Sequence, residues 1–379
     1  MKNIIGRDEE CRRLWKILDR QSVVLASLRR IGKTCTLKKM AAEPQEGWQT
    51  VLYIVQGKKS VEEFVQGLYN ELVSKGIVKP QANRVREFYN TWLGGTKPFG
   101  NYELPELRQH WKVVLGKMLE DVAESQKPTL ILLDEFPWML YELIITYKSE
   151  DECMELLNIL RTYREQYEGQ SRLRFIFCGS IGINIVLDHL VKEHKYLGNP
   201  INNMYTFVLE EMNETDAAAL CSHLSWVYEL EEAGGVNDHI ARSVQNLPFY
   251  IDLVFKELSQ KGTTAPTIAE VDATVLELVQ DVSGNGNFDH FRERIDTYYS
   301  PADRLLGYLL LKNFALENRP LNRQDILQLA RHETPAIEDD ALNDCLKDLT
   351  RDLYLRMDAE GRFTFRYALL QRWWKMHYC

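Results

Sequence analysis

The sequence feature that most constrains the fold is an apolar segment that runs directly into the loop Ser27-Leu28-Arg29-Arg30-Ile31-Gly32-Lys33-Thr34. In loops of this pattern, successive backbone N–H groups surround a phosphate chain at the start of a helix. Lys33 is then placed to reach the β- and γ-phosphates, and the Thr34 hydroxyl to ligate Mg²⁺. The pattern G-x-x-x-x-G-K-[ST] calls for glycine where Ser27 stands, but serine is small enough for the loop to close. The segment therefore predicts a strand, a phosphate loop and a helix, in that order.

Composition narrows the class of protein. The 379 residues are enough for two or three domains, and 45% hydrophobic and 27% charged residues are typical of soluble globular proteins. No window reaches the roughly 20 apolar residues of a membrane span, and the polar start Met1-Lys2-Asn3 lacks a secretory apolar stretch. Seven scattered cysteines without a C-x-x-C pair favour reduced thiols. We therefore expect a cytoplasmic protein with no membrane partner. The net charge of −9 argues against extensive binding of nucleic acid over the protein surface.

The first half of the chain alternates short apolar runs with helical patterns, which predicts a parallel sheet with helices on both faces. We therefore expect an α/β P-loop core over residues 1–212, with Leu93–Gly100 as an insertion between its second and third strands. The expected strands are Ser22–Ala26, Thr50–Val55, Thr129–Leu133, Leu173–Cys178 and Tyr205–Leu209. The helical patterns between them are Asp8–Asp19, Thr34–Ala41, Ser60–Lys75, Leu104–Glu124 and Glu150–Tyr167, and Lys38-Lys39 is expected on a solvated helix face.

Strand patterns stop after Met212, and the remaining chain is predicted to be mainly helical. We expect an all-α lid over residues 213–286, closed by the turn-rich Ser283-Gly284-Asn285-Gly286-Asn287. Residues 287–379 then follow the order of a winged-helix domain, with three helices, a hairpin near Asp358–Gly361 and a last helix from Ala368. The expected helices are Asp216–Leu230, Asn237–Gln245, Pro248–Lys261 and Ile268–Asp281 in the lid, then Asp303–Asn313, Arg323–Leu329 and Ile337–Thr350.

Two further strands end in residues suited to catalysis. The apolar run Thr129–Leu133 is followed by Asp134 and Glu135, which places two carboxylates at the carboxyl edge of the sheet, beside the phosphate loop. Asp134 is suited to the Mg²⁺ shell, and Glu135 to orienting and polarising an attacking water. An acidic helix start would explain both acids as well, but the upstream loop favours catalysis. Ser180, after the next strand, is predicted to bond the γ-phosphate or the water, or else to cap the following helix.

These strand ends, in this order and followed by a helical segment, resemble the AAA+/STAND branch of P-loop ATPases. The resemblance is greatest to the archaeal-type ATPase family, whose relatives include the origin-recognition ATPases, and it covers nearly the whole chain. Ile5-Gly6-Arg7-Asp8-Glu9-Glu10 matches the family's amino-terminal box near the adenine, and Arg29–Thr34, with Cys35 next to it, matches its phosphate loop. Asn246-Leu247-Pro248 stands where the family has Gly-x-Pro in a lid turn that approaches the nucleotide, and Phe365-Arg366-Tyr367 with Arg372-Trp373-Trp374 resembles its carboxyl-terminal signature.

The resemblance implies an ATPase that binds ATP or ADP with Mg²⁺, but one expected residue type is missing. Relatives often place an arginine after the fourth strand to act on a neighbouring subunit's γ-phosphate, whereas no arginine occurs here between Arg174 and Arg242. Such an arginine is worth about 10³–10⁵ in rate. Unless Lys192, Lys195 or an arginine from elsewhere replaces it, we expect slow hydrolysis, and hence a nucleotide-dependent switch rather than a fast motor.

The charge of the carboxyl-terminal segment bears on its partner. From Pro301 to Cys379 twelve Lys and Arg balance twelve Asp and Glu, and Ile337–Thr350 carries five acids against Lys347. Phosphate contacts supply most of the affinity for a DNA duplex, and these acids would repel the phosphates. DNA is therefore disfavoured as a partner, and the alternative is that DNA is contacted through the hairpin. We expect this segment to dock to a protein partner or effector, or to another part of the same chain, and we expect Trp373-Trp374 in the core. A homo-oligomer stays open, as do two other functions: an origin-recognition-like DNA loader, or a nucleotide-bound scaffold without useful turnover.

Overall fold

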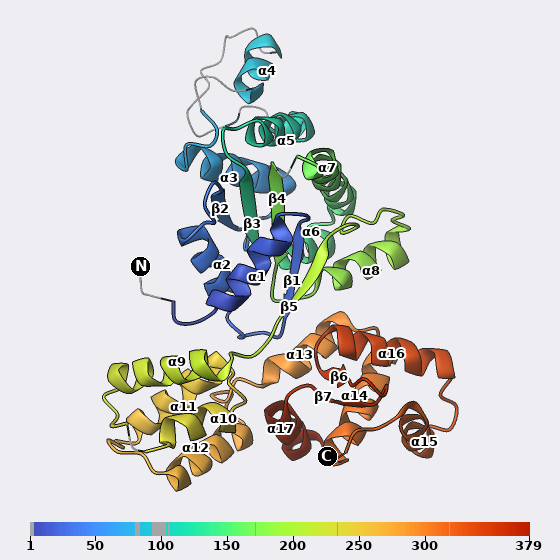
Figure 1. Ribbon diagram of the computed structural model, residues 1–379. Helices are drawn as coiled ribbons and strands as arrows, with labels where there is room; N and C mark the ends of the chain where they lie inside the picture. Colours follow the sequence, from blue (N-terminus) through green and yellow to red (C-terminus); the bar gives the residue numbers. More distant parts are fainter. Residues whose placement is uncertain are drawn as a thin grey trace. The chain divides into compact units, whose positions relative to one another are not determined.

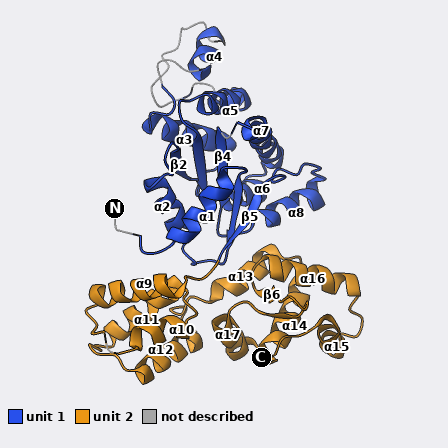
Figure 2. Ribbon diagram, in the orientation of Figure 1, with its two compact units in different colours: residues 1–209 blue, residues 210–379 orange. Residues whose placement is uncertain are grey.

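The computed structural model describes residues 4–79, 84–92, 104, 107–170, 172–232, 234–317 and 319–379. The chain divides into two compact units, Met1–Leu209 and Glu210–Cys379 (Figure 2). The expected insertion at Leu93–Gly100 lies outside the described residues. The expected division at residues 286 and 287 falls inside the second unit and stays a prediction.

The first unit is built on a parallel sheet with the strand order β2-β3-β4-β1-β5 (Figure 1). Each strand lies within one residue of its expected bounds, so the strand predictions are confirmed. The central strands β3 and β4 are buried along their whole length, as strands covered on both faces should be. The strands are β1 (Val23–Ser27), β2 (Gln49–Ile54), β3 (Thr129–Asp134), β4 (Leu173–Cys178) and β5 (Tyr205–Leu209).

Helices cover this sheet, and three helices of the first unit have no counterpart among the expected helices. The segment that forms α6 is apolar almost throughout, so it lacks the polar face that marks a helix in sequence, although Pro137 in its first turn is typical of a helix start. The helices are α1 (Asp8–Leu18), α2 (Lys33–Ala42), α3 (Val61–Ser74), α4 (Arg84–Trp92), α5 (Leu107–Ala123), α6 (Phe136–Ile145), α7 (Glu150–Glu168) and α8 (Ile183–His194). Of these, α4, α6 and α8 were not expected.

The second unit is mainly helical, as predicted. Its first part holds α9 (Glu214–Val227), α10 (Val236–Ser243), α11 (Pro248–Gln260) and α12 (Ile268–Gln280). After α13 (Asp289–Tyr298), which was not expected, come α14 (Pro301–Leu316), α15 (Arg323–Glu333) and α16 (Asp339–Arg351). The antiparallel hairpin of β6 (Leu355–Met357) and β7 (Phe363–Phe365) follows, and α17 (Ala368–Tyr378) ends the chain. None of the helices in the described residues is long and apolar enough to cross a membrane.

Aromatic packing joins the two parts of the second unit. Phe288 stacks on Tyr250 of α11, with ring centroids 4.8 Å apart, and on Trp373 of α17, at 5.8 Å. Trp373 and Trp374 are each 1% exposed, so their expected place in the core is confirmed. The Gln245 side chain accepts a hydrogen bond from the backbone N–H of Leu369 at 2.9 Å. The turn before α11 is therefore fastened to the start of α17.

Candidate functional site

The phosphate loop between β1 and α2 has the backbone shape that an anion needs. Arg30 and Gly32 adopt left-handed conformations, with φ of 68° and 98°. Glycine at the N-cap offers no side-chain acceptor to the first N–H groups of α2, so these donors and the positive end of the helix dipole are left for a ligand. Ser27 does not adopt a positive φ, so the glycine that the pattern calls for is not required there.

Lys33, the first residue of α2, turns back into this loop. It is 7% exposed, and its Nζ donates hydrogen bonds to the backbone oxygens of Leu28 at 3.0 Å and Ser27 at 3.5 Å. The ammonium group therefore lies within reach of a phosphate held by the loop. Ile31 is buried and anchors the loop, whereas Arg29 and Cys35 are exposed beside it.

The amino-terminal segment is fastened to the loop by two buried cations. Arg7, in a left-handed conformation before α1, donates from Nη2 to the Ile31 backbone oxygen at 2.8 Å. Lys39 of α2 donates to the Gly6 backbone oxygen at 2.8 Å and pairs with Asp8. The expectation that Lys39 is solvated is therefore wrong, because Lys39 is buried and its ammonium group binds the segment that contains Gly6 and Asp8. The position of that segment near an adenine stays a prediction.

The strand end of β3 supplies oxygen ligands next to the loop. The Thr34 hydroxyl donates to Asp134 Oδ2 at 2.8 Å, and the Glu135 backbone N–H donates to Asp134 Oδ1 at 3.1 Å. Burial raises the pKa of Asp134, against the opposing effect of the Thr34 hydrogen bond. A hydroxyl and a buried carboxylate are hard oxygen donors of the kind that Mg²⁺ prefers, and a cation would restore the charged form of Asp134. These two residues therefore fit a magnesium ion.

Sequence reasoning missed Cys178, the last residue of β4, which also hydrogen-bonds the Asp134 side chain. Burial raises the pKa of this thiol well above its ordinary value, so it stays neutral beside the carboxylate. The only sequence signal for this contact is that Cys178 ends a strand at the same sheet edge.

Glu135 and Ser180 bind each other. Glu135 is in a left-handed conformation, with φ of 61°, at the start of α6. Its Oε2 accepts hydrogen bonds from the Ser180 backbone N–H at 2.8 Å and from the Ser180 hydroxyl at 2.7 Å. Ser180 does not cap α8, whose N-cap is Gly182, so the capping interpretation is wrong. The structure thus brings together the ends of β1, β3 and β4.

The remaining predicted site residue, Pro248, lies in the second unit as the first residue of α11. Gln245 and Asn246 before it are both left-handed, with φ of 56° and 54°. Asparagine tolerates this conformation better than most residues, which explains how it replaces the glycine of the family pattern. The Asn246 backbone oxygen accepts from Met212 N–H at 3.1 Å, so the turn is well anchored within its unit.

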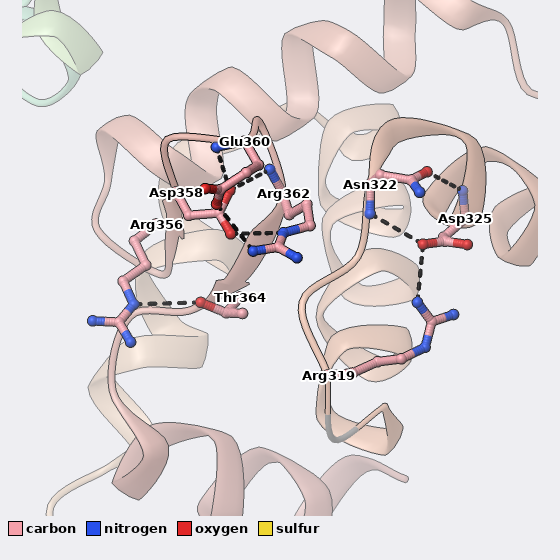
Figure 3. A network of polar contacts seen from close by, with 8 residues as sticks. All are labelled: Arg319, Asn322, Asp325, Arg356, Asp358, Glu360, Arg362 and Thr364. Carbon is pink, nitrogen blue, oxygen red and sulfur yellow. Dashed lines mark hydrogen bonds and ion pairs between the residues drawn. The ribbon is translucent and has the colours of Figure 1, made fainter.

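The hairpin side of the second unit has several exposed arginines, and carboxylates of the same unit bind Arg319 and Arg362, whereas Arg356 donates to the Thr364 hydroxyl (Figure 3). Arg362 pairs with Asp358 at 2.8 Å and with Glu360 at 3.0 Å, and Arg319 pairs with Asp325 at 3.0 Å. Similar pairs join Arg323 and Arg331 to Asp339, Arg351 to Asp348, and Arg366 to Glu210. A nucleic-acid phosphate would have to compete with these carboxylates.

Comparison with known proteins agrees with this geometry. Residues 17–187 match the family model described as AAA domain. The match lies within the first unit and includes the loop of Lys33 and the ends of β3 and β4. The whole chain also shares the fold of the Walker-type ATPase of Pyrococcus abyssi, with 14% identity, a TM-score of 0.61, and 98% of this chain and 96% of the other covered. The expected likeness to archaeal-type ATPases is thus confirmed at the level of the fold.

Two other solved structures resemble the chain at lower TM-scores. The ORC2 protein of Aeropyrum pernix has 13% identity and a TM-score of 0.41, with 99% of this chain and 97% of the other covered. The STAND protein with a tetratricopeptide repeat sensor from Pyrococcus horikoshii has 13% identity and a TM-score of 0.40, and the match covers 100% of this chain and 43% of the other. No curated protein matches the chain in sequence.

Proposed function

We propose that this chain is a cytoplasmic, ATP-binding and slowly hydrolysing molecular switch whose nucleotide state controls how the second unit engages a partner protein. The observation that carries the proposal is the hydrogen-bonded series from Thr34 through Asp134 and Glu135 to Ser180. It connects the phosphate loop with two strand ends at one edge of the sheet, where parallel α/β folds bind their ligands.

In this proposal the loop and the first turn of α2 bind the phosphates of ATP or ADP. Lys33 exchanges the backbone oxygens of Ser27 and Leu28 for phosphate oxygens. Thr34 and Asp134 would hold Mg²⁺, which when bound neutralises charge on the β- and γ-phosphates. Lys33 and Asp134 are both buried, so each gains a strong interaction when the nucleotide and metal bind together.

Glu135 is the proposed general base. Its carboxylate would accept the proton of an attacking water, and Ser180 holds one of its oxygens so that the other can face that water. We expect slow turnover because no arginine occurs between Arg174 and Arg242, and two arginines before this gap serve the fold. Arg174 donates to the backbone oxygens of Leu18 and Glu168, and Arg164 to that of Pro200. Neither guanidinium is available to the γ-phosphate.

The second unit is suited to respond as one body. The turn of Asn246 and Pro248, which the family resemblance implies is near the nucleotide, is tied to α17 through Gln245. A difference in contacts between ATP and ADP at this turn would change the relative stability of two states of the unit. This is the physical basis of the proposed switch.

The test is Glu135→Gln, which keeps the size of the side chain and removes the base. We expect ATP hydrolysis to fall about 100-fold or more, as for the loss of a general base, while ATP stays bound and its occupancy rises. Glu142→Gln in the same helix is the matched control. Hydrolysis at the wild-type rate in Glu135→Gln would exclude this role, and loss of ATP binding would show that the side chain is needed for the site itself.

The second unit disfavours the alternative of a DNA loader, because exposed arginines such as Arg319 and Arg362 are paired with carboxylates (Figure 3). Affinity that rests on phosphate contacts falls steeply with salt. Binding to a duplex at two salt concentrations separates the functions: weak binding at both agrees with the switch, and tight binding that salt abolishes would favour the loader.

A further inference from the structure

The negative charge of the chain is concentrated in one segment. Residues 210–286 contain fourteen Asp and Glu against three Lys and Arg, a formal charge of −11. Residues 1–209 carry +3 and residues 287–379 carry −1 by the same count. This segment comprises α9 to α12 in the second unit (Figure 1). Such a charge attracts basic partners over long range and repels nucleic acids and anionic membranes.

Within this acidic segment, α9 presents an exposed face without charges. Trp226 is 77% exposed and Val227 is 46% exposed at the end of the helix. Ala219, Ser222 and His223 are also exposed, and their spacing of three to four residues continues the same face toward the helix start. The rings of His223 and Trp226 lie 6.0 Å apart. Exposed tryptophan is rare outside interfaces, where it often dominates the binding energy.

The turn after α9 forms a hollow beside this tryptophan. The hollow has a volume of about 540 Å³ and is lined by Ser225, Trp226, Val227, Glu229, Leu230 and Glu231. Backbone hydrogen bonds fix its shape, from Leu230 N–H to the Ser225 oxygen at 2.9 Å and from Glu231 N–H to the Thr264 oxygen at 2.7 Å. The hollow is therefore formed before any partner arrives, which lowers the entropic cost of binding.

Carboxylates stand at the rim of the hollow. Glu229 and Glu231 line it, and Glu232 follows them in sequence, with all three exposed. Glu229 adopts a left-handed conformation, with φ of 54°, which is uncommon for a residue with a side chain. An aromatic anchor with an acidic rim is complementary to a segment that combines apolar side chains with Arg or Lys. Arginine also stacks well on tryptophan.

We propose that the surface of Trp226, Val227, Glu229, Glu231 and Glu232 docks a basic, amphipathic segment of a partner protein. An apolar side chain of that segment enters the hollow, and its Arg or Lys residues contact the three glutamates. This surface goes beyond the proposed function, because docking requires neither nucleotide binding nor hydrolysis by the first unit.

The test uses the full chain and a fluorescein-labelled synthetic peptide of about 18 residues, in which Leu and Arg alternate at helical spacing. Binding is followed by fluorescence anisotropy, without nucleotide. We expect Trp226→Ala to weaken binding about tenfold or more, the size of a hot-spot loss. The triple variant Glu229→Gln, Glu231→Gln, Glu232→Gln should weaken it similarly and reduce its salt dependence. A peptide with Glu in place of Arg should not bind.

Two controls make the corresponding kinds of change at other exposed positions of the second unit. Leu305→Ala removes another apolar side chain, 70% exposed on α14. The triple variant Glu338→Gln, Asp340→Asn, Asp344→Asn removes the same charge from exposed positions at α16. Both controls should bind within about twofold of the wild type, as distant sites do. Circular dichroism of every variant confirms that a loss of binding is not a loss of fold.

Several outcomes would overturn the proposal. Equal losses in the two triple variants would mean that bulk charge alone attracts the peptide. If Trp226→Ala bound the peptide with wild-type affinity, Trp226 would not be the anchor of the surface. Self-association of the wild type that Trp226→Ala abolishes would assign the surface to a second copy, and a changed basal ATP hydrolysis in Trp226→Ala would assign it to the first unit. If the peptide bound equally well with and without ATP, this would contradict the proposed switch but not the docking surface.

Discussion

The phosphate-loop edge of the sheet and the hairpin side of the second unit both gather charged groups, but they hold them in opposite ways. Lys33 and Asp134 are 7% and 2% exposed, and each is bonded to a neighbour from the loop or α2. Arg362 and Arg319 pair with carboxylates while their side chains stay 46% and 56% exposed. Buried charges are costly without a compensating partner, whereas exposed ion pairs contribute little. The difference supports the proposal that the sheet edge binds a ligand through buried charges, whereas the charges of the hairpin side are satisfied at the surface.

The largest effect is expected from Lys33→Ala. The variant removes the cation that would bind the β- and γ-phosphates, so ATP affinity should fall about 100-fold, or ~3 kcal/mol. Titration calorimetry with ATP and Mg²⁺ measures the change. Lys38→Ala, an exposed position on the same helix, should bind ATP as the wild type does. Unchanged affinity in Lys33→Ala would break the comparison, because its buried charge would then serve the fold alone.

A smaller effect is expected from Ser180→Ala, which removes one of the two donors to Glu135 and keeps the backbone N–H. We expect kcat for ATP hydrolysis to fall about tenfold with little change in KM, since the base is less well oriented. Ser180→Thr retains the hydroxyl and is the control. If Thr and Ala reduce kcat equally, the hydroxyl has no orienting role.

Asp121 on α5 tests whether buried carboxylates in the first unit are costly outside the site. Burial, as the largest cause, raises its pKa from 3.8 to about 6. The folded state therefore holds the proton more tightly than the unfolded state, so the stability from this group is fully present below a pH of about 3.8 and is lost as the pH rises to about 6. Asp121→Asn should accordingly gain about 1–2 kcal/mol in free energy of unfolding relative to the wild type between pH 4.5 and 7.5. Urea denaturation at several pH values measures this, and a gain at acidic pH instead would contradict the assignment.

The smallest effect is expected from Arg362→Ala at the hairpin. Because its two ion pairs are exposed, the free energy of unfolding should stay close to that of the wild type. ATP hydrolysis should stay at the wild-type rate. Urea denaturation checks the first expectation, and a clear shift of the unfolding midpoint to lower urea would show that the hairpin charges hold the fold together.

Local patterns predicted most of the fold. The five strands were found because each is a short apolar run, and the sheet edge was found because the carboxyl ends of parallel strands meet there. Helix α6 was missed because it is apolar almost throughout, so its sequence shows no clear alternation of polar and apolar faces. Helix α13 was missed for the opposite reason, since few of its residues are apolar.

The candidate site shows the same limit at the level of side chains. Thr34, Asp134 and Glu135 could be assigned because sequence motifs mark the ends of β1 and β3. The bonds from Ser180 to Glu135 and from Lys39 to Gly6 could not be assigned, because they depend on side-chain directions between elements far apart in sequence. Periodicity predicts which face a residue occupies, but not which backbone oxygen a buried lysine will find.

The most direct test of the account is ATP binding and turnover by the wild-type chain alone, with and without Mg²⁺. We predict saturable ATP binding and Mg²⁺-dependent hydrolysis at about 10⁻⁴–10⁻² s⁻¹, the range of P-loop enzymes that work without an arginine supplied by a partner. Absence of ATP binding, or turnover of many ATP per second without a partner, would contradict it.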